Sequence, residues 1–171
     1  MTGEPPTGSV AVGRLSSPSV DPLRHALYEA AFWREGPRPP LDEVLSHPRV
    51  AVYIEGWGRS GDTAVVARDS TGAIGGAAWF RFFTEASHGY GFINDAVPEV
   101  TIGLDELWRG LGIGTRLITA LHTEARASGI ARLSLSVEHD NRALRLYQRL
   151  GYGELTRDNG AVTMLAELEQ A

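Results

Sequence analysis

Hydrophobic positions recur with two different periods along this chain, and the two periods predict different secondary structures. Residues 132–138 (RLSLSVE) alternate strictly between apolar and polar side chains, which is typical of a half-buried strand. Residues 112–129 instead place apolar side chains three or four positions apart, as on one face of a helix that ends at Gly129. The same helical spacing covers residues 23–36, where a Gly-Pro pair predicts the stop. We therefore expect strands and helices to be mixed along the chain.

The complete pattern predicts alternating blocks of strand and helix. In chain order we expect a strand at 10–15, a helix at 23–36, one or two short helices within 41–58, strands at 63–69, 73–83 and 99–105, a helix at 112–129, a strand at 132–138, a helix at 141–151, and closing strands at about 152–157 and 161–168. Residues 84–98 read as a long loop. Because a crossover helix joins residues 99–105 to residues 132–138, these two strands should be parallel.

Composition is that of one globular domain. The chain has 171 residues, of which 43% are hydrophobic and 22% are charged. We expect a disordered lead at residues 1–9 and a single domain over residues 10–171. The lead has neither the basic start nor the apolar core of a signal peptide, and no apolar run is long enough to cross a membrane. The expected location is therefore the cytoplasm.

Charge and residue usage exclude several functions. The net charge is −5, and acidic residues are interleaved with the arginines between positions 109 and 149, so we expect no nucleic-acid partner. There is no cysteine, which excludes disulfides, thiolate zinc sites and a cysteine nucleophile. The five histidines are scattered without HExxH spacing, so we expect no metal, and the chain has no GxSxG motif of a serine hydrolase.

Residues 109–114 read RGLGIG, with glycine at every second position, between a predicted strand and a predicted helix. Unpaired N–H groups and the helix dipole attract an anion to a helix start, and glycine lets the anion approach the backbone. The motif therefore predicts a phosphate or pyrophosphate site, although a tight strand-to-helix turn alone also uses glycine. It matches neither a Walker A loop nor the GxGxxG dinucleotide fingerprint.

This motif resembles the pyrophosphate-binding Arg-x-x-Gly-x-Gly of the GNAT superfamily, the acyl-CoA-dependent N-acyltransferases. A second stretch, NRALRLYQRLGY at residues 141–152, begins 27 residues after Gly114 and is similar to the family's second signature. The element order also agrees from about residue 10 to the end. The resemblance implies an α/β (α+β) fold: a central mixed, mostly antiparallel sheet of about seven strands, flanked by helices and splayed between the fourth and fifth strands.

The resemblance also implies where acetyl-CoA would bind. The pyrophosphate would lie on the backbone after Arg109, and the pantetheine arm would extend the strand at 99–105 by backbone pairing. The residues implied in cofactor binding are Ile102, Gly103, Leu104, Arg109, Gly110, Leu111, Gly112, Ile113, Gly114, Thr115, Asn141 and Tyr147. For Asn141, an N-cap of the following helix is a compatible reading.

Two residues are candidates for catalysis of amine attack on a thioester. Glu99 stands where the family often has a carboxylate base, and Tyr147 matches the tyrosine that faces the coenzyme A sulfur and acts as an acid. An exposed glutamate at a strand start and a tyrosine packed in the core are the structural alternatives. Asp95 and Asp105 are the other candidate bases, and His88 in the long loop is a weaker candidate for contact with substrate.

The expected function is transfer of an acetyl group from coenzyme A to a primary amine of a small molecule or a protein. The alternatives are a non-catalytic acyl-CoA sensor or regulatory module, and more remotely a nucleotide-binding domain of another class. Tyr90 and Phe92 lie in the glycine-bearing loop, which could close over an acceptor. A homodimer is possible by analogy with relatives, and the amine itself is not specified by the sequence.

Overall fold

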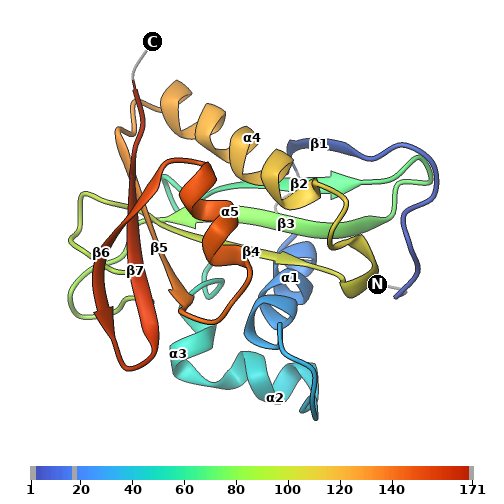
Figure 1. The fold of residues 1–171 in the computed structure, drawn as a ribbon, viewed down its shortest axis with the longest axis horizontal. Helices are drawn as coiled ribbons and strands as arrows, with labels where there is room; N and C mark the ends of the chain where they lie inside the picture. The colour runs from blue at the N-terminus through green and yellow to red at the C-terminus, as the bar shows by residue number, and fades with distance from the viewer. Residues whose placement is uncertain (1–2, 17–18, 170–171) are drawn as a thin grey trace.

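The structure is a computed structural model that describes residues 3–16 and 19–169. One seven-stranded sheet runs through the described chain in the order β1-β2-β3-β4-β5-β7-β6, with helices on both faces (Figure 1). The strands are β1 (Ala11–Arg14), β2 (Thr63–Arg68), β3 (Ile74–Arg81), β4 (Glu99–Leu104), β5 (Arg132–Glu138), β6 (Tyr152–Asp158) and β7 (Ala161–Glu167). The helices are α1 (Asp21–Ala31), α2 (Leu41–Ser46), α3 (Pro48–Ala51), the 3-10 helix η1 (Glu106–Trp108), α4 (Ile113–Ala127) and α5 (Ala143–Arg149).

The sheet is antiparallel except at its centre. Every neighbouring pair is antiparallel apart from β4 and β5, which are parallel and pair only at Glu99 and Ser134. Beyond this point the two strands diverge, while β5 continues in full register with β7. The structure thus confirms the predicted seven-stranded, mostly antiparallel sheet with its opening between the fourth and fifth strands.

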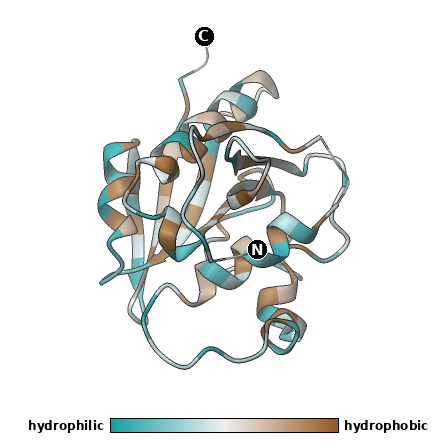
Figure 2. Ribbon diagram, turned by 90° about the vertical axis from the view of Figure 1, so that its right-hand side faces the viewer, coloured by the Kyte–Doolittle hydropathy of each residue, from teal (hydrophilic) through white to brown (hydrophobic). Residues whose placement is uncertain are grey.

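Two hydrophobic cores fill the two faces of the sheet. The first packs α4 and α5 on one face, around fully buried residues such as Leu117, Leu121 and Phe80. The second packs α1 to α3 on the opposite face, around Leu23 and Trp79. The helices carry both hydrophobic and hydrophilic residues (Figure 2), as the helical period predicted. Alternating residues of β2 and β3 therefore belong to different cores.

Element types were predicted correctly, but some boundaries were wrong. The first helix ends at Ala31, five residues before the expected stop at the Gly-Pro pair. Arg38 explains the early end, because its guanidinium donates to the carbonyl oxygen of Phe32 at 3.0 Å and to both carboxylate oxygens of Glu29. A residue outside the helix thus satisfies one of the orphan carbonyls at its C-terminus. The short helix η1 was not predicted from the sequence.

The described part of the lead lies against the hairpin of β2 and β3. Thr7 donates its backbone N–H to Asp69 at 2.9 Å, and its carbonyl accepts the hydroxyl and the N–H of Ser70. The carbonyl of Glu4 accepts the indole N–H of Trp108 at 3.0 Å. Glu4 and Thr7, two residues of the lead that was expected to be disordered, therefore bond to the domain, while residues 1–2 lie outside the described chain.

Candidate active site

The divergence of β4 from β5 leaves peptide groups of β4 without a neighbouring strand. Ser134 donates its N–H to the carbonyl of Pro98 at 3.0 Å, so this carbonyl points toward β5. Peptide groups two residues apart point the same way along a strand. Those of Ile102 and Leu104 therefore face the opening, whereas Gly103 directs its own toward β3, where it is paired with Ala77.

Gly103 has a different role, because it lets α1 approach the sheet. A Cβ atom at this position would lie 1.7 Å from the carbonyl oxygen of Ala26. Any side chain here would therefore push α1 away from β4. This close contact places the residues of α1 beside the open end of β4.

The RGLGIG loop forms the start of α4, as the sequence predicted. Gly110 and Gly112 have φ angles of +75° and +74°, a conformation that favours glycine, and a Cβ atom at either would meet nothing within 4 Å. Gly112 is the N-cap of α4, and the first turn of the helix contains no acidic residue. The backbone here is accessible, and the helix start is free of negative side chains, which suits an anion.

Gly114 has ordinary backbone angles and serves packing instead. A Cβ atom there would lie 3.3 Å from a methyl carbon of Leu146 in α5 and 3.7 Å from a methyl carbon of Leu104 in β4. The start of α4, the end of β4 and α5 therefore meet at one point. Leu111 within the loop is exposed, while Ile113 is buried and anchors the first turn of α4.

Arg109 is held by two groups near the loop. Its Nε donates to the carbonyl oxygen of Leu104 at 3.0 Å, and its Nη2 lies 2.8 Å from a carboxylate oxygen of Glu29 in α1. About a third of the side chain remains exposed. Arg109 thus joins α1 to the end of β4.

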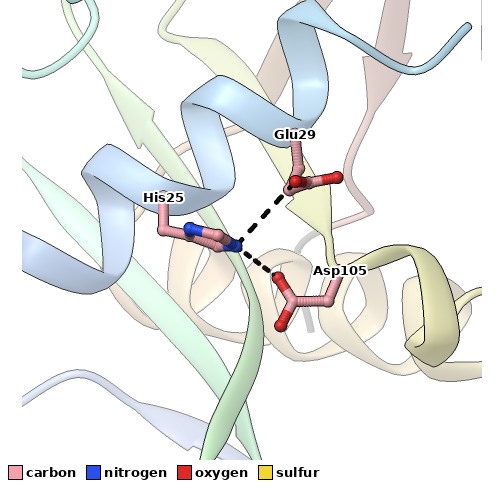
Figure 3. Close-up of side chains that lie close together, drawn as sticks. All are labelled: His25, Glu29 and Asp105. Atoms are coloured by element: carbon pink, nitrogen blue, oxygen red, sulfur yellow. Dashed lines mark hydrogen bonds and ion pairs between the residues drawn. The ribbon is translucent and has the colours of Figure 1, made fainter. Parts of the chain in front are cut away.

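Glu29 belongs to a cluster that the sequence analysis missed. His25 and Glu29 lie one turn apart on α1, and the Nε2 atom of His25 is 2.6 Å from Asp105 Oδ1 and 3.9 Å from Glu29 Oε1 (Figure 3). Histidine and carboxylates are ligand types for zinc. However, both oxygens of Glu29 already accept hydrogen bonds from the guanidinium groups of Arg38 and Arg109. We therefore interpret the cluster as an ion-pair network that connects α1 to the residues that follow β4.

The spacing of His25 and Glu29 was visible in the sequence, since residues four apart share a helix face. Asp105 could not be added to them from spacing, because it lies 80 residues away from His25. The two other candidate bases have different surroundings. Asp105 is buried and bonded to His25, whereas Asp95 is exposed in the loop.

Glu99 lies at the single point where β4 pairs with β5, and it is only 2% exposed. Its Oε1 atom accepts the hydroxyl of Tyr53 at 2.7 Å and the N–H of Gly91 at 2.8 Å, while Oε2 has no partner among the described residues. Burial raises the pKa of Glu99 to about 7, although the bonds from Tyr53 and Gly91 and the nearby His88 oppose this shift. An exposed glutamate was the structural alternative, and it is excluded.

The loop at residues 84–98 covers this carboxylate. Tyr53 holds the loop, because its hydroxyl oxygen accepts the N–H of Tyr90 at 2.7 Å while its proton is donated to Glu99. The glycines are required here: a Cβ atom at Gly91 would lie 2.6 Å from the carbonyl carbon of Leu135. His88 stacks on Phe92, with ring centroids 4.5 Å apart, and stays within the loop. Tyr53 has no sequence motif that could have identified it.

Tyr147 lies in α5 and is buried, with its ring edge-on to Tyr152 at 5.9 Å between centroids. Burial alone raises the pKa of its hydroxyl, so the group keeps its proton near neutral pH. Asn141 precedes α5, and its Oδ1 accepts the N–H of Ala143 at 2.9 Å. Because the N-cap of α5 is Arg142, Asn141 bonds to the backbone from one residue before the predicted cap position.

Comparison with known proteins agrees with this geometry. The sequence profile of the acetyltransferase (GNAT) family matches residues 26–152, and the chain belongs to this family. It is 35% identical over 86 residues to a mycothiol acetyltransferase of Nocardiopsis dassonvillei; the match covers 48% of this chain and 26% of that protein. The chain therefore spans about a quarter of that curated relative.

Solved structures share the fold. An N-acetyltransferase from Staphylococcus aureus superposes with a TM-score of 0.67 at 18% identity, covering 95% of this chain and 100% of the other. A phosphinothricin acetyltransferase from Sinorhizobium meliloti, solved in complex with AcCoA, gives 0.66 at 19% identity, covering 93% and 88%. Among the described residues, no helix is long and apolar enough to span a membrane.

Proposed function

We propose that this chain is an acetyl-CoA-dependent N-acetyltransferase that acts on a primary amine. The observation that carries the proposal is the position of Glu99: a buried carboxylate with a raised pKa and one unpartnered oxygen stands where β4 and β5 begin to diverge. Family membership and the name of the Nocardiopsis relative support acetyl as the group transferred.

Residues around the opening suit coenzyme A. The amides of Gly110 to Thr115 would hold the pyrophosphate, since the loop backbone is accessible and carries no acid. The peptide group of Ile102 would pair with the pantetheine amides, as in strand addition, and the N–H of Leu104 is left for the reacting carbonyl. Arg109 would reach a phosphate oxygen by exchanging its contact with Glu29, which keeps Arg38 as a partner.

Bound acetyl-CoA supplies an activated acyl group, and the residues of the chain manage protons and orientation. Glu99 takes a proton from the acceptor ammonium, which frees the nitrogen lone pair to attack the thioester carbonyl. The N–H of Leu104 stabilises the developing oxyanion. The C–S bond then breaks as Tyr147 donates a proton to the departing thiolate, and the second proton of the attacking nitrogen leaves to restore the tyrosine hydroxyl. The products are the acetamide and free coenzyme A.

The loop at residues 84–98 has to open before an acceptor reaches Glu99. Its backbone covers the carboxylate, and Tyr53 joins the two by hydrogen bonds. Loops that close over a reacting group exclude water from it, which preserves the raised pKa of a buried base.

Replacing Glu99 with glutamine tests the proposal. Glu99→Gln keeps the size of the side chain but removes the base, so turnover should fall by about 100-fold or more. Acetyl-CoA binding should not change, because the peptide groups of the opening remain. Transfer is measured as thiol release with a panel of primary amines, and binding by titration calorimetry.

Two outcomes of these assays distinguish a catalytic acetyltransferase from a non-catalytic acyl-CoA sensor. Loss of acetyl-CoA affinity in the variant, equal to its loss of turnover, would contradict the role of Glu99 as a base. Tight acetyl-CoA binding without transfer to any amine in the unmodified protein would favour an acyl-CoA sensor.

A further inference from the structure

Three buried oxygens at one point of the sheet have no hydrogen-bond partner. Among the described residues, the buried side-chain N and O atoms without a partner are Oε2 of Glu99, Oγ1 of Thr101 and Oγ of Ser134. Glu99 is 2% exposed and Ser134 is 0% exposed. An unpaired buried polar atom costs free energy, so such atoms are rare in folded proteins. Hydroxyl and carboxylate oxygens of this kind can accept hydrogen bonds from a bound polar group.

The backbone places the three side chains on one face. Glu99 and Ser134 are the paired residues of β4 and β5, so their side chains project to the same side. Thr101 follows Glu99 by two positions on β4 and shares that side as well. Neighbouring strands lie roughly 5 Å apart, and residues two apart on a strand lie roughly 7 Å apart. The three oxygens therefore lie on one face of the sheet, around the point where β4 and β5 separate.

The charges at this face favour a cationic group. Arg81 pairs with Glu99 across β3 and β4, but its guanidinium is already bonded to Asp62 at 2.8 Å and to the carbonyls of Val52 and Glu55. Asp62 neutralises it at close range. The negative charge of Glu99 is therefore left for the ligand, and two hydroxyl oxygens add acceptor capacity.

We propose that Glu99 Oε2, Thr101 Oγ1 and Ser134 Oγ together bind the ammonium group of the acceptor, which we call the ammonium seat. A primary ammonium has three N–H donors, one for each oxygen. A secondary ammonium has two donors and leaves one buried oxygen unpaired, so the seat selects primary amines. This inference rests on the proposed function, and it adds Thr101 and Ser134 as specificity residues.

A methylammonium series tests the seat without any acetyl transfer. Methylammonium, dimethylammonium and tetramethylammonium have the same charge but three, two and no N–H donors. At equal high concentration and constant ionic strength, methylammonium should raise the Tm by about 2 °C or more, dimethylammonium less, and tetramethylammonium not at all. Equal shifts for the three cations would overturn the proposal.

Two variants and one control assign the effect to residues. In Ser134→Ala and in Thr101→Val, the three cations should give equal Tm shifts. Ser136 is the next residue on the same face of β5, and Ser136→Ala should keep the larger Tm shift with methylammonium than with dimethylammonium or tetramethylammonium. Without cation, Ser134→Ala should leave the Tm unchanged or raise it, because the lost hydroxyl has no partner. A lowered Tm would show a structural hydroxyl and contradict the seat.

Transfer assays distinguish the two proposals. With a primary alkylamine, Ser134→Ala should reduce kcat/KM at least about tenfold, chiefly through KM, while acetyl-CoA affinity is kept. If no amine is acetylated but the cation order is observed, the proposed function fails and the seat stands. If amines are acetylated and the variants change neither KM nor the cation order, the seat fails and the function stands.

Discussion

At the scale of single residues, the burial of Glu99 determines how the protein responds to pH. The carboxyl titrates at about 7 in the folded chain and near 4.5 when unperturbed. Because the base must be ionised to accept a proton, kcat/KM should rise with pH up to about 7 and then level off. Tyr53, His88 and Arg81 are the ionisable groups around it, and Tyr53 keeps its proton because burial raises its pKa.

The same carboxyl makes folding less favourable at high pH. Below its unfolded pKa, Glu99 is protonated in both states and costs nothing; as pH rises toward 7, only the unfolded state loses the proton, so stability falls. The cost above pH 7 is on the order of 3 kcal/mol, from a shift of about 2.5 units at 1.36 kcal/mol each.

Urea unfolding of the protein and of Glu99→Gln measures this contribution. The stability of the variant relative to the parent should increase by on the order of 3 kcal/mol between about pH 5 and about pH 8. A constant difference across this range would mean that Glu99 titrates normally in the folded chain.

The residue scale also shows what a motif can identify. Glu99, Tyr147 and the glycine loop were identified as candidates through the family resemblance, and their catalytic and binding roles stay predictions. Tyr53 and Ser134 could not be found this way, since a lone tyrosine after α3 and a serine in an alternating strand are ordinary residues. Only the sheet register and the loop bring them to Glu99.

At the scale of elements, the contact of α1 with β4 depends on Gly103. Gly103→Ala should lower stability by about 3 kcal/mol, because the added carbon would overlap the Ala26 carbonyl and a backbone atom cannot move as a side chain can. Gly13→Ala is the matched control, since Gly13 also lies in a strand but has open space around its Cβ position. Urea unfolding should show a change below about 1 kcal/mol for the control. Equal effects would contradict the close contact.

Elements themselves were predictable where a local pattern defines them. The strand at 132–138 and the helix after RGLGIG follow from period and glycine, and both occur within two residues of the expected bounds. The end of α1 was wrong because Arg38, beyond the helix, provides the cap. Boundaries set by a distant partner leave no local signal.

At the scale of the whole molecule, the opening between β4 and β5 should make the protein a coenzyme A binder. Acetyl-CoA at about 100 times its Kd should stabilise the fold by about 2.7 kcal/mol, or several degrees in Tm. ATP and NAD at matched concentration are the controls and should give no comparable shift. A shift with ATP or NAD but none with acetyl-CoA would identify RGLGIG as a phosphate loop of another kind.

The sequence by itself determined the strand and helix periods, the glycines of the loop at the start of α4, and the two motifs that indicate an acyltransferase. These are local properties, encoded by neighbours in the chain. Tertiary structure alone decided that Glu99 is buried under the loop at 84–98, that His25 meets Asp105, and that Thr101 and Ser134 share its face. Burial and unpaired oxygens depend on elements far apart in sequence, and these long-range contacts set the chemistry of the site.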